Sequence, residues 1–298
     1  MHSLEFLEID KRLWIADKLG NCKRNHFLDV AKLIYFYQTG ECSYEAFRTM
    51  VLFVLLDMEY KKDEFEAGEE EKWQNIYQCS ELIDSFFAVG EDGRKHLILD
   101  FLHNPVKSVK YKLHTFYGPK DNFGGVTYGQ LEDGFGEFEN FKRTNEIEYL
   151  VRLFATFYIL PNETYDKVNM EKRVQYFAHL DIRYIYGFYL YFISFINYLT
   201  KECVILLDGK EIEICMLFTS SNDDSTKVND NNLEVESIGL RSTSFQLAES
   251  GVFGPHKDVR KEGFMQILIR MCDLIFRSRK EAKEAEAAKE QSQNNNND

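Results

Sequence analysis

An uncharged run at residues 184–199, YIYGFYLYFISFINYL, constrains the fold more than any other part of the sequence. Aromatic and aliphatic side chains at this density must leave water, either in a bilayer or in a protein core. A membrane-spanning helix requires ~20 predominantly apolar residues, whereas this run has 16 and is interrupted by Gly187, Ser194 and Asn197. We therefore predict a central helix that its neighbours bury, in a protein that does not enter a membrane.

The composition is typical of a helical protein with an acidic surface. The 298 residues are 44% hydrophobic, enough for one large core or two modest ones. Aromatic residues make up 15% of the chain and only 4 residues are proline, which favours helices packed through large rings. The net charge of −13 opposes nonspecific binding to nucleic acids or anionic membranes. Six cysteines without a CxxC pair, and no signal peptide, predict free thiols in a reducing compartment.

Helical periodicity dominates our interpretation of the first 90 residues. Apolar positions recur at spacings of three and four within residues 27–37 and again within residues 47–55, and Gly40 with Ser43 separates the two segments. A third helix is predicted over residues 69–87, with acidic residues at its start. We therefore expect residues 1–90 to form an N-terminal helical region.

Two segments change to a period of two, which is typical of strands. Alternation at residues 97–102 and 109–113 predicts a hairpin near residues 96–114, turned at Asn104 and Pro105. Residues 204–207 and 211–218 flank Asp208 and Gly209, a favoured two-residue turn. This second hairpin is expected near residues 203–218.

Helices are predicted again from Thr127, which stands three residues before Gln130 in the form of a capping box. Asn145 and Glu148 have the looser Asx form of the same signal, and Pro161 ends the helix that follows them. Aromatic and aliphatic residues line both predicted helices. The segment thus predicts two consecutive helices.

The last third of the chain predicts a long C-terminal helix over residues 259–279, preceded by a surface loop at 219–232 and a helical piece at 242–248. Residues 280–298 read as a charged helical extension and a disordered Asn-rich tail. The predicted fold class is mainly α (α+β), a multi-helix bundle with two short β-hairpins. We predict that residues 91–279 form the main helical domain, between the N-terminal region of residues 1–90 and the extension of residues 280–298.

No motif in the sequence predicts catalysis or a cofactor. The glycine pairs lack the spacing of a phosphate-binding loop, and no HExxH motif is present. The alternative hypothesis is a hydrolase of a phage defence or counter-defence system, using either a metal or a cysteine nucleophile. The candidate metal ligands are His96, His103 and His114. The candidate cysteine nucleophile is Cys203, with His179 and Asp181. We predict no enzymatic activity, no cofactor and no metal.

Two runs resemble a pattern of tail-assembly-chaperone-like and virion-associated proteins of Bacteroidetes phages and prophages. The first, residues 104–165, contains a strand pair ending in YGP, a helix opened by TYGQ and a TNEIEYL helix leading to an aromatic stretch. The second, residues 239–268, contains FQLAE, a GVFG stop and an apolar closing helix. Together these runs cover about a third of the chain.

The resemblance implies a non-enzymatic protein that acts through contacts with other phage proteins in tail or virion assembly. It would work in the host cytoplasm and could remain in the virion, without nucleic acid or membrane; self-association is left open. In this view the glycine and proline shape a turn, the threonine and glutamine cap a helix, and the aromatic residues are buried or bind a partner. These structural or partner-binding residues are Gly118, Pro119, Thr127, Gln130, Phe135, Phe138, Tyr149, Phe154, Phe245 and Phe253.

Overall fold

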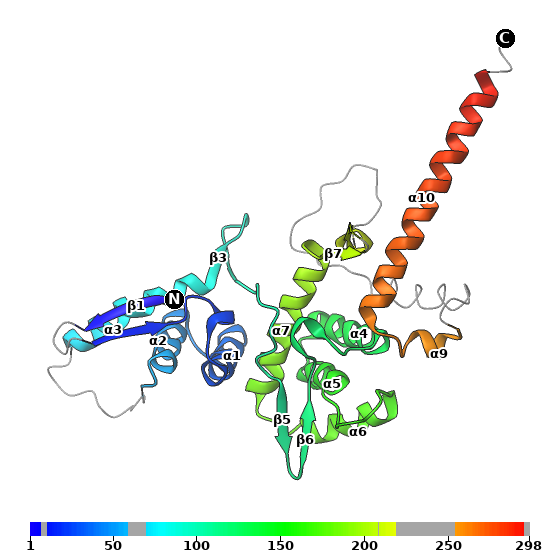
Figure 1. Ribbon diagram of the computed structural model, residues 1–298. Helices are drawn as coiled ribbons and strands as arrows, with labels where there is room; N and C mark the ends of the chain where they lie inside the picture. The colour runs from blue at the N-terminus through cyan, green and yellow to red at the C-terminus, as the bar shows by residue number, and fades with distance from the viewer. Residues whose placement is uncertain (7–10, 59–69, 208, 219–253, 295–298) are drawn as a thin grey trace. The chain divides into compact units, whose positions relative to one another are not determined.

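A computed structural model describes residues 1–6, 11–58, 70–207, 209–218 and 254–294 of the chain. Helices dominate these residues, and the strands form four two-stranded antiparallel sheets, so the predicted class of a mainly α protein with short hairpins is confirmed (Figure 1). The chain divides into two compact units. Unit 1 comprises residues 1–124 and 140–195, and unit 2 comprises residues 125–139 and 196–298.

These units differ from the division expected at residues 90 and 279. Residues 91–124 belong to the same unit as the N-terminal helices, because the Pro105 carbonyl accepts from Arg24 at the start of the first of these helices and Asp100 accepts from Lys18. The helix that crosses residue 279 continues without a break to Asn294. Each unit is therefore built from two segments that are not consecutive in the sequence.

The N-terminal part of unit 1 contains two of the predicted helices, α1 (Arg24–Gln38) and α2 (Tyr44–Leu55). The expectation that everything before residue 90 is helical is wrong at both ends. A hairpin of β1 (His2–Phe6) and β2 (Lys11–Ile15) precedes α1, and its more exposed and less exposed side chains alternate as in a strand. The third helix, α3 (Glu70–Ser80), gives way to a 3-10 helix, η3 (Glu81–Phe86), and then to a strand.

The strands that follow do not pair as predicted. β3 (Phe87–Val89) pairs with β4 (Lys95–Leu97), and β5 (Ser108–Tyr111) pairs with β6 (His114–Tyr117). The second hairpin turns at Lys112 and Leu113, with Lys112 at φ +53°, and not at Asn104 and Pro105. The reason is that Asn104 is buried and bonds to other loops, so this segment serves as a connection.

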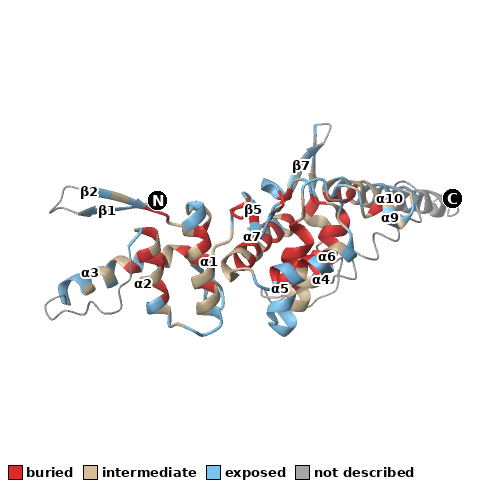
Figure 2. Cartoon of the chain, turned by 90° about the horizontal axis from the view of Figure 1, so that it is seen from below, coloured by how far each residue is buried: buried red, intermediate tan, exposed pale blue. Residues whose placement is uncertain are grey.

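The rest of unit 1 is built around aromatic side chains of α5 (Ile147–Phe157), α6 (Lys167–Phe177) and α7 (Ile182–Lys201). Figure 2 shows buried residues along α5 and α7. The rings of Phe154 and Tyr158 stack at 3.8 Å between centroids, and those of Phe123 and Phe195 at 4.1 Å. The prediction of a buried helix at residues 184–199 is confirmed. Among the helices that the structure describes, none has the length and hydropathy of a membrane span.

One predicted helix cap in this region is wrong. Asn145 does not cap α5; it has φ +57° and its N–H donates to the Phe141 carbonyl at 2.8 Å, so it terminates α4 (Tyr128–Thr144). Asparagine tolerates this left-handed conformation better than most residues. The residue that precedes α5 is Glu146, without a side-chain cap.

Unit 2 contains the first part of α4, the hairpin of β7 (Val204–Leu207) and β8 (Lys210–Glu213), and the helices α9 (His256–Val259) and α10 (Phe264–Asn294). The predicted hairpin is present, but residues beyond Glu213 form a 3-10 helix, η5 (Ile214–Leu217). The long helix begins at Phe264 instead of residue 259, because the preceding residues pair with the start of α4. The predictions for residues 219–232, 242–248 and 295–298 lie outside the described residues.

Candidate functional site

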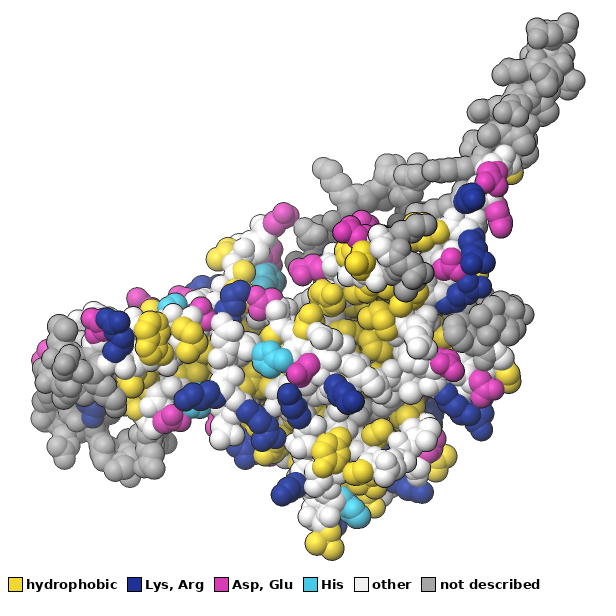
Figure 3. Space-filling view, viewed as in Figure 1, with side chains coloured by type: hydrophobic (Ala, Val, Ile, Leu, Met, Phe, Trp, Pro, Cys, Tyr) yellow, Lys and Arg dark blue, Asp and Glu magenta, His cyan; other side chains and the backbone are white. Residues whose placement is uncertain are grey.

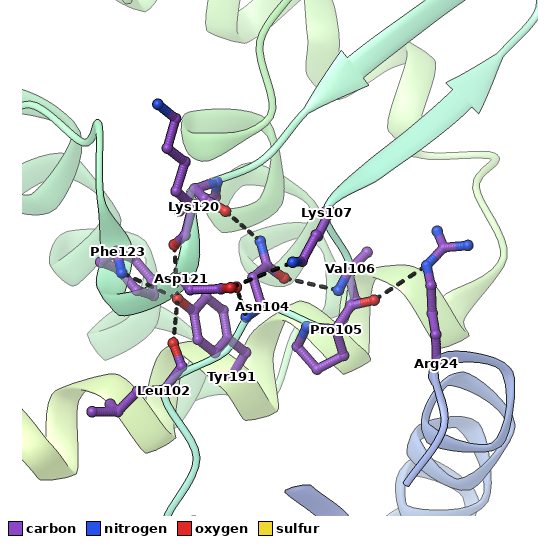
Figure 4. Close-up of polar contacts among 11 residues, drawn as sticks. Arg24, Leu102, Asn104, Pro105, Val106, Lys107, Lys120, Asp121, Phe123 and Tyr191 are labelled. Carbon is purple, nitrogen blue, oxygen red and sulfur yellow. Dashed lines mark hydrogen bonds and ion pairs between the residues drawn. The ribbon is translucent and has the colours of Figure 1, made fainter. Parts of the chain in front are cut away.

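A buried asparagine joins the two loops that flank the β5–β6 hairpin. The Asn104 Nδ2 group donates to the Pro119 carbonyl at 2.7 Å, and its Oδ1 accepts from the Val106 N–H at 2.8 Å (Figure 4). Its own backbone N–H donates to Oδ1 of Asp121 at 2.8 Å. Because Asn104 has no exposed surface, each of these bonds replaces one that water would otherwise make. The two loops are thereby fixed to each other.

A tyrosine from α7 satisfies the backbone of the same loops. The Tyr191 hydroxyl accepts from the Phe123 N–H at 3.1 Å, and the carbonyl oxygens of Lys120 and Leu102 lie 3.1 and 3.3 Å away as acceptors for its proton. Burial raises the pKa of Tyr191, so the hydroxyl stays protonated and able to donate. The site is thus supported from the central helix.

A second tyrosine requires a glycine beside it. Tyr158 donates its hydroxyl proton to the Val106 carbonyl, and a Cβ atom at Gly118 would lie 2.5 Å from the Tyr158 ring. Only glycine allows the ring to approach this closely. Gly118 and Pro119, which the resemblance places in a turn, lie at the end of β6 where they meet Tyr158 and Asn104.

Charged side chains cover the solvent side of these loops. Lys107 Nζ lies 3.4 Å from Oδ2 of Asp121, and both side chains are about half exposed or more. The N–H of Asn104 lowers the pKa of Asp121, with Lys107 and the nearby His103 acting in the same direction. Asp121 therefore remains a carboxylate in neutral solution.

Arg24 extends this charged surface from the start of α1. Its Nε donates to the Pro105 carbonyl at 3.3 Å and its Nη2 donates to the Ser108 carbonyl at 3.1 Å (Figure 4). These acceptors are neutral, so the guanidinium keeps its full charge. Residues separated by more than 80 positions in the sequence thus form one surface.

A second polar cluster lies inside unit 2. Arg260 donates to Oε2 of Glu132 and to Oδ2 of Asp133, both at 2.6 Å, and its carbonyl accepts from the Gly129 N–H at 2.9 Å. Both carboxylate side chains are at least nine-tenths buried. An acidic pair on a helix is usually solvated, but Glu132 and Asp133 are buried because an arginine 127 residues or more along the chain pairs with them.

The predicted capping box at the start of α4 is present. The Gln130 N–H donates to Oγ1 of Thr127 at 3.3 Å, and Oε1 of Gln130 accepts from the Thr127 N–H at 3.1 Å. This reciprocal pair is the pattern that the sequence spacing predicts. Both residues support the fold at this position.

The aromatic residues singled out by the resemblance are mostly inside the protein. Phe135, Phe138 and Phe154 are buried, and Tyr149 is half-buried. Phe245 and Phe253 lie outside the described residues. Of the two roles implied for these rings, the three buried ones fill the core.

The residues of the hydrolase hypothesis do not form a metal site. Within the described part of the chain, no three His, Cys, Asp or Glu side chains are placed to hold a metal ion. His96 bonds to Asp92 at 3.0 Å, and His103 lies against the Phe101 ring. Burial raises the pKa of the Cys203 thiol, which is opposite to what a cysteine nucleophile requires.

Each of the four described hairpins exposes an apolar side chain that the sequence reasoning missed. Trp14 is 59% exposed, Val89 71%, Leu113 98% and Leu206 72%. Leu113 stands at the turn of β5–β6, between Lys112 and His114, where no neighbouring element covers it. Its position in a tight turn becomes visible only once the strands are correctly paired.

Comparisons with protein families, with curated proteins and with solved structures found no match.

Proposed function

We propose that this protein acts without catalysis, by binding other proteins through its β-hairpins. The observation that carries the proposal is the exposed apolar side chain on each described hairpin, above all Leu113. Each described sheet has two strands, so edge strands such as β5 offer backbone groups to a partner strand, whereas β6 already bonds to Ile159 at Tyr117. Transferring one leucine side chain from water into an interface contributes about 1.5–3 kcal/mol. Several hairpins used together would give a stable contact.

We further propose that the partners are phage tail or virion proteins. The resemblance of residues 104–165 and 239–268 supports this setting, and the β5–β6 hairpin lies within the first run. The protein would then act in the host cytoplasm during assembly and could remain in the particle.

The test is a pull-down of the tagged full-length protein from phage-infected cells, followed by mass spectrometry. We expect tail, portal or capsid proteins to co-purify, and the double substitution Leu113→Ser with Leu206→Ser to reduce their recovery. Val168→Ser is the matched control, since Val168 is 68% exposed but lies on α6. Equal recovery with the hairpin variant and the control would refute binding through the hairpins. Recovery of the protein without any particle component would refute the phage setting.

A further inference from the structure

The surface around the Asn104 loops is positively charged although the whole chain carries −13. Exposed cationic side chains and one histidine gather there on α1, on the loops and at the start of β5 (Figure 3). This basic patch is defined by Lys23, Arg24, His103, Lys107 and Lys120. Its four permanent cations outnumber the two carboxylates beside them, Asp121 and Asp57, so its formal charge is +2.

Two carboxylates offset part of this charge: Asp121 pairs with Lys107, and the pKa of the exposed Asp57 is lowered by His26 and by Lys23, which lies close to it. Arg24 donates to two carbonyl oxygens. Among the described residues, no carboxylate forms an ion pair with Lys23, Arg24 or Lys120. The charge of cations that form no ion pair remains available to attract an anionic partner.

The patch is also held rigid. Arg24 is oriented by its two bonds to the loop backbone, and that backbone is fixed by Asn104 and Tyr191. Figure 4 shows Arg24, Lys107 and Lys120 arranged around the loops. The backbone that carries these charges is already ordered before a partner binds. This reduces the entropy cost of association.

We propose that the basic patch binds an acidic segment of a partner protein, and this proposal rests on the proposed protein-binding function. Arginine and lysine recognise carboxylates through charge-assisted hydrogen bonds. Exposed apolar surface lies close to the charges in sequence at Tyr117, which is three residues before Lys120 and 50% exposed, and Leu113 stands at the far end of the same hairpin. A segment with several carboxylates and an apolar residue matches both features.

The charge distribution favours a peptide over a nucleic acid. Strong binding to a nucleic acid uses about 6–10 phosphate contacts, whereas the patch offers four permanent cations interrupted by Asp121. The remaining acidic surface would repel a long polyanion. A short acidic segment avoids this repulsion, because charges beyond ~8 Å are largely screened at physiological ionic strength.

The experiment measures fluorescence anisotropy of a labelled peptide, EEEELEEE, titrated with the full-length protein at about 50 mM NaCl. The patch variant combines Lys23→Glu, Lys107→Glu and Lys120→Glu. A control variant with the same net charge changes three exposed lysines elsewhere: Lys172→Glu, Lys201→Glu and Lys257→Glu. A third variant, with Lys→Gln at the three patch positions, removes charge without adding repulsion. Far-UV circular dichroism verifies that each variant is folded.

We expect the patch variant to weaken peptide binding by about tenfold or more, the Lys→Gln variant to weaken it less, and the control to change it by less than about twofold. Equal weakening by the patch and control variants would overturn the proposal, as would the absence of peptide binding to the unmodified protein. Tighter binding of an oligothymidylate of eight nucleotides would instead assign the patch to nucleic acid. If particle proteins still co-purify while the peptide does not bind, the patch proposal fails and the proposed function stands.

Discussion

Replacing Asn104 with alanine tests whether the loops that carry the basic patch depend on this buried side chain. The substitution removes the donor to the Pro119 carbonyl and the acceptor for the Val106 N–H. Both partner residues are buried, so neither backbone group gains water in exchange. The bond from the Asn104 N–H to Asp121 belongs to the main chain and is retained.

The expected loss of stability follows from these two unsatisfied groups. A buried donor or acceptor left without its partner costs about 1–3 kcal/mol. Two such groups predict a decrease in the free energy of unfolding of about 3 kcal/mol or more for Asn104→Ala. Asn140→Ala is the matched control, because the Asn140 side chain accepts from Arg143 on the surface, and this loss should change stability by less than about 0.5 kcal/mol.

Urea unfolding monitored by tryptophan fluorescence measures this loss. The chain has two tryptophans, Trp14 and Trp73, and both belong to unit 1 together with Asn104. With a urea dependence of about 2–3 kcal/mol per molar, a loss of 3 kcal/mol lowers the midpoint by about 1–1.5 M. A decrease below about 1 kcal/mol, or an equal decrease in the Asn140→Ala control, would show that the loops do not depend on Asn104.

Three further results are expected. Arg260→Leu should destabilise unit 2 by about 3–5 kcal/mol in urea unfolding followed by circular dichroism, because it leaves two buried carboxylates without their guanidinium; a loss under 1 kcal/mol would contradict this. The lowered pKa of Asp121 means that its carboxylate stabilises the fold above the unfolded pKa of about 3.9 and loses this effect as the pH falls through the lower folded value. The urea midpoints of the unmodified protein and Asp121→Asn should therefore converge below about pH 4, whereas a constant difference would refute the assignment. Truncation after Arg279 should lower the helical signal at 222 nm and change the free energy of unfolding by less than about 0.5 kcal/mol, because the described side chains at 280, 281, 284 and 285 are exposed; a larger loss would show that the end of α10 packs on the protein.

Local patterns predicted the helices well where one face or all faces of a segment are apolar. The spacings within residues 27–37 and 47–55 correspond to α1 and α2, and the uncharged run corresponds to α7. The Thr127–Gln130 spacing also predicted a cap whose two hydrogen bonds are present. Such features depend on neighbours within one or two turns, so the sequence contains the information needed to predict them.

Strand pairing was predicted less well because it depends on which segments meet. The alternation at residues 97–102 predicts a strand paired with the one that follows, whereas β4 ends at Leu97 and pairs with β3. Asn104 and Pro105 resemble a turn in sequence, but the side chain of Asn104 bonds across to Pro119 and fixes a longer loop. A period of two indicates a strand and does not identify its partner.

The sequence by itself determined that the protein is mainly helical, that it is acidic and that its longest apolar run forms a buried helix, because composition and periodicity are properties of neighbouring residues. The tertiary structure alone decided where the charges lie. Arg24 reaches Pro105 across 81 positions, and Arg260 reaches Glu132 across 128. Contacts of this kind form only when the core brings distant segments together, and the basic patch and the buried carboxylate cluster are their consequence.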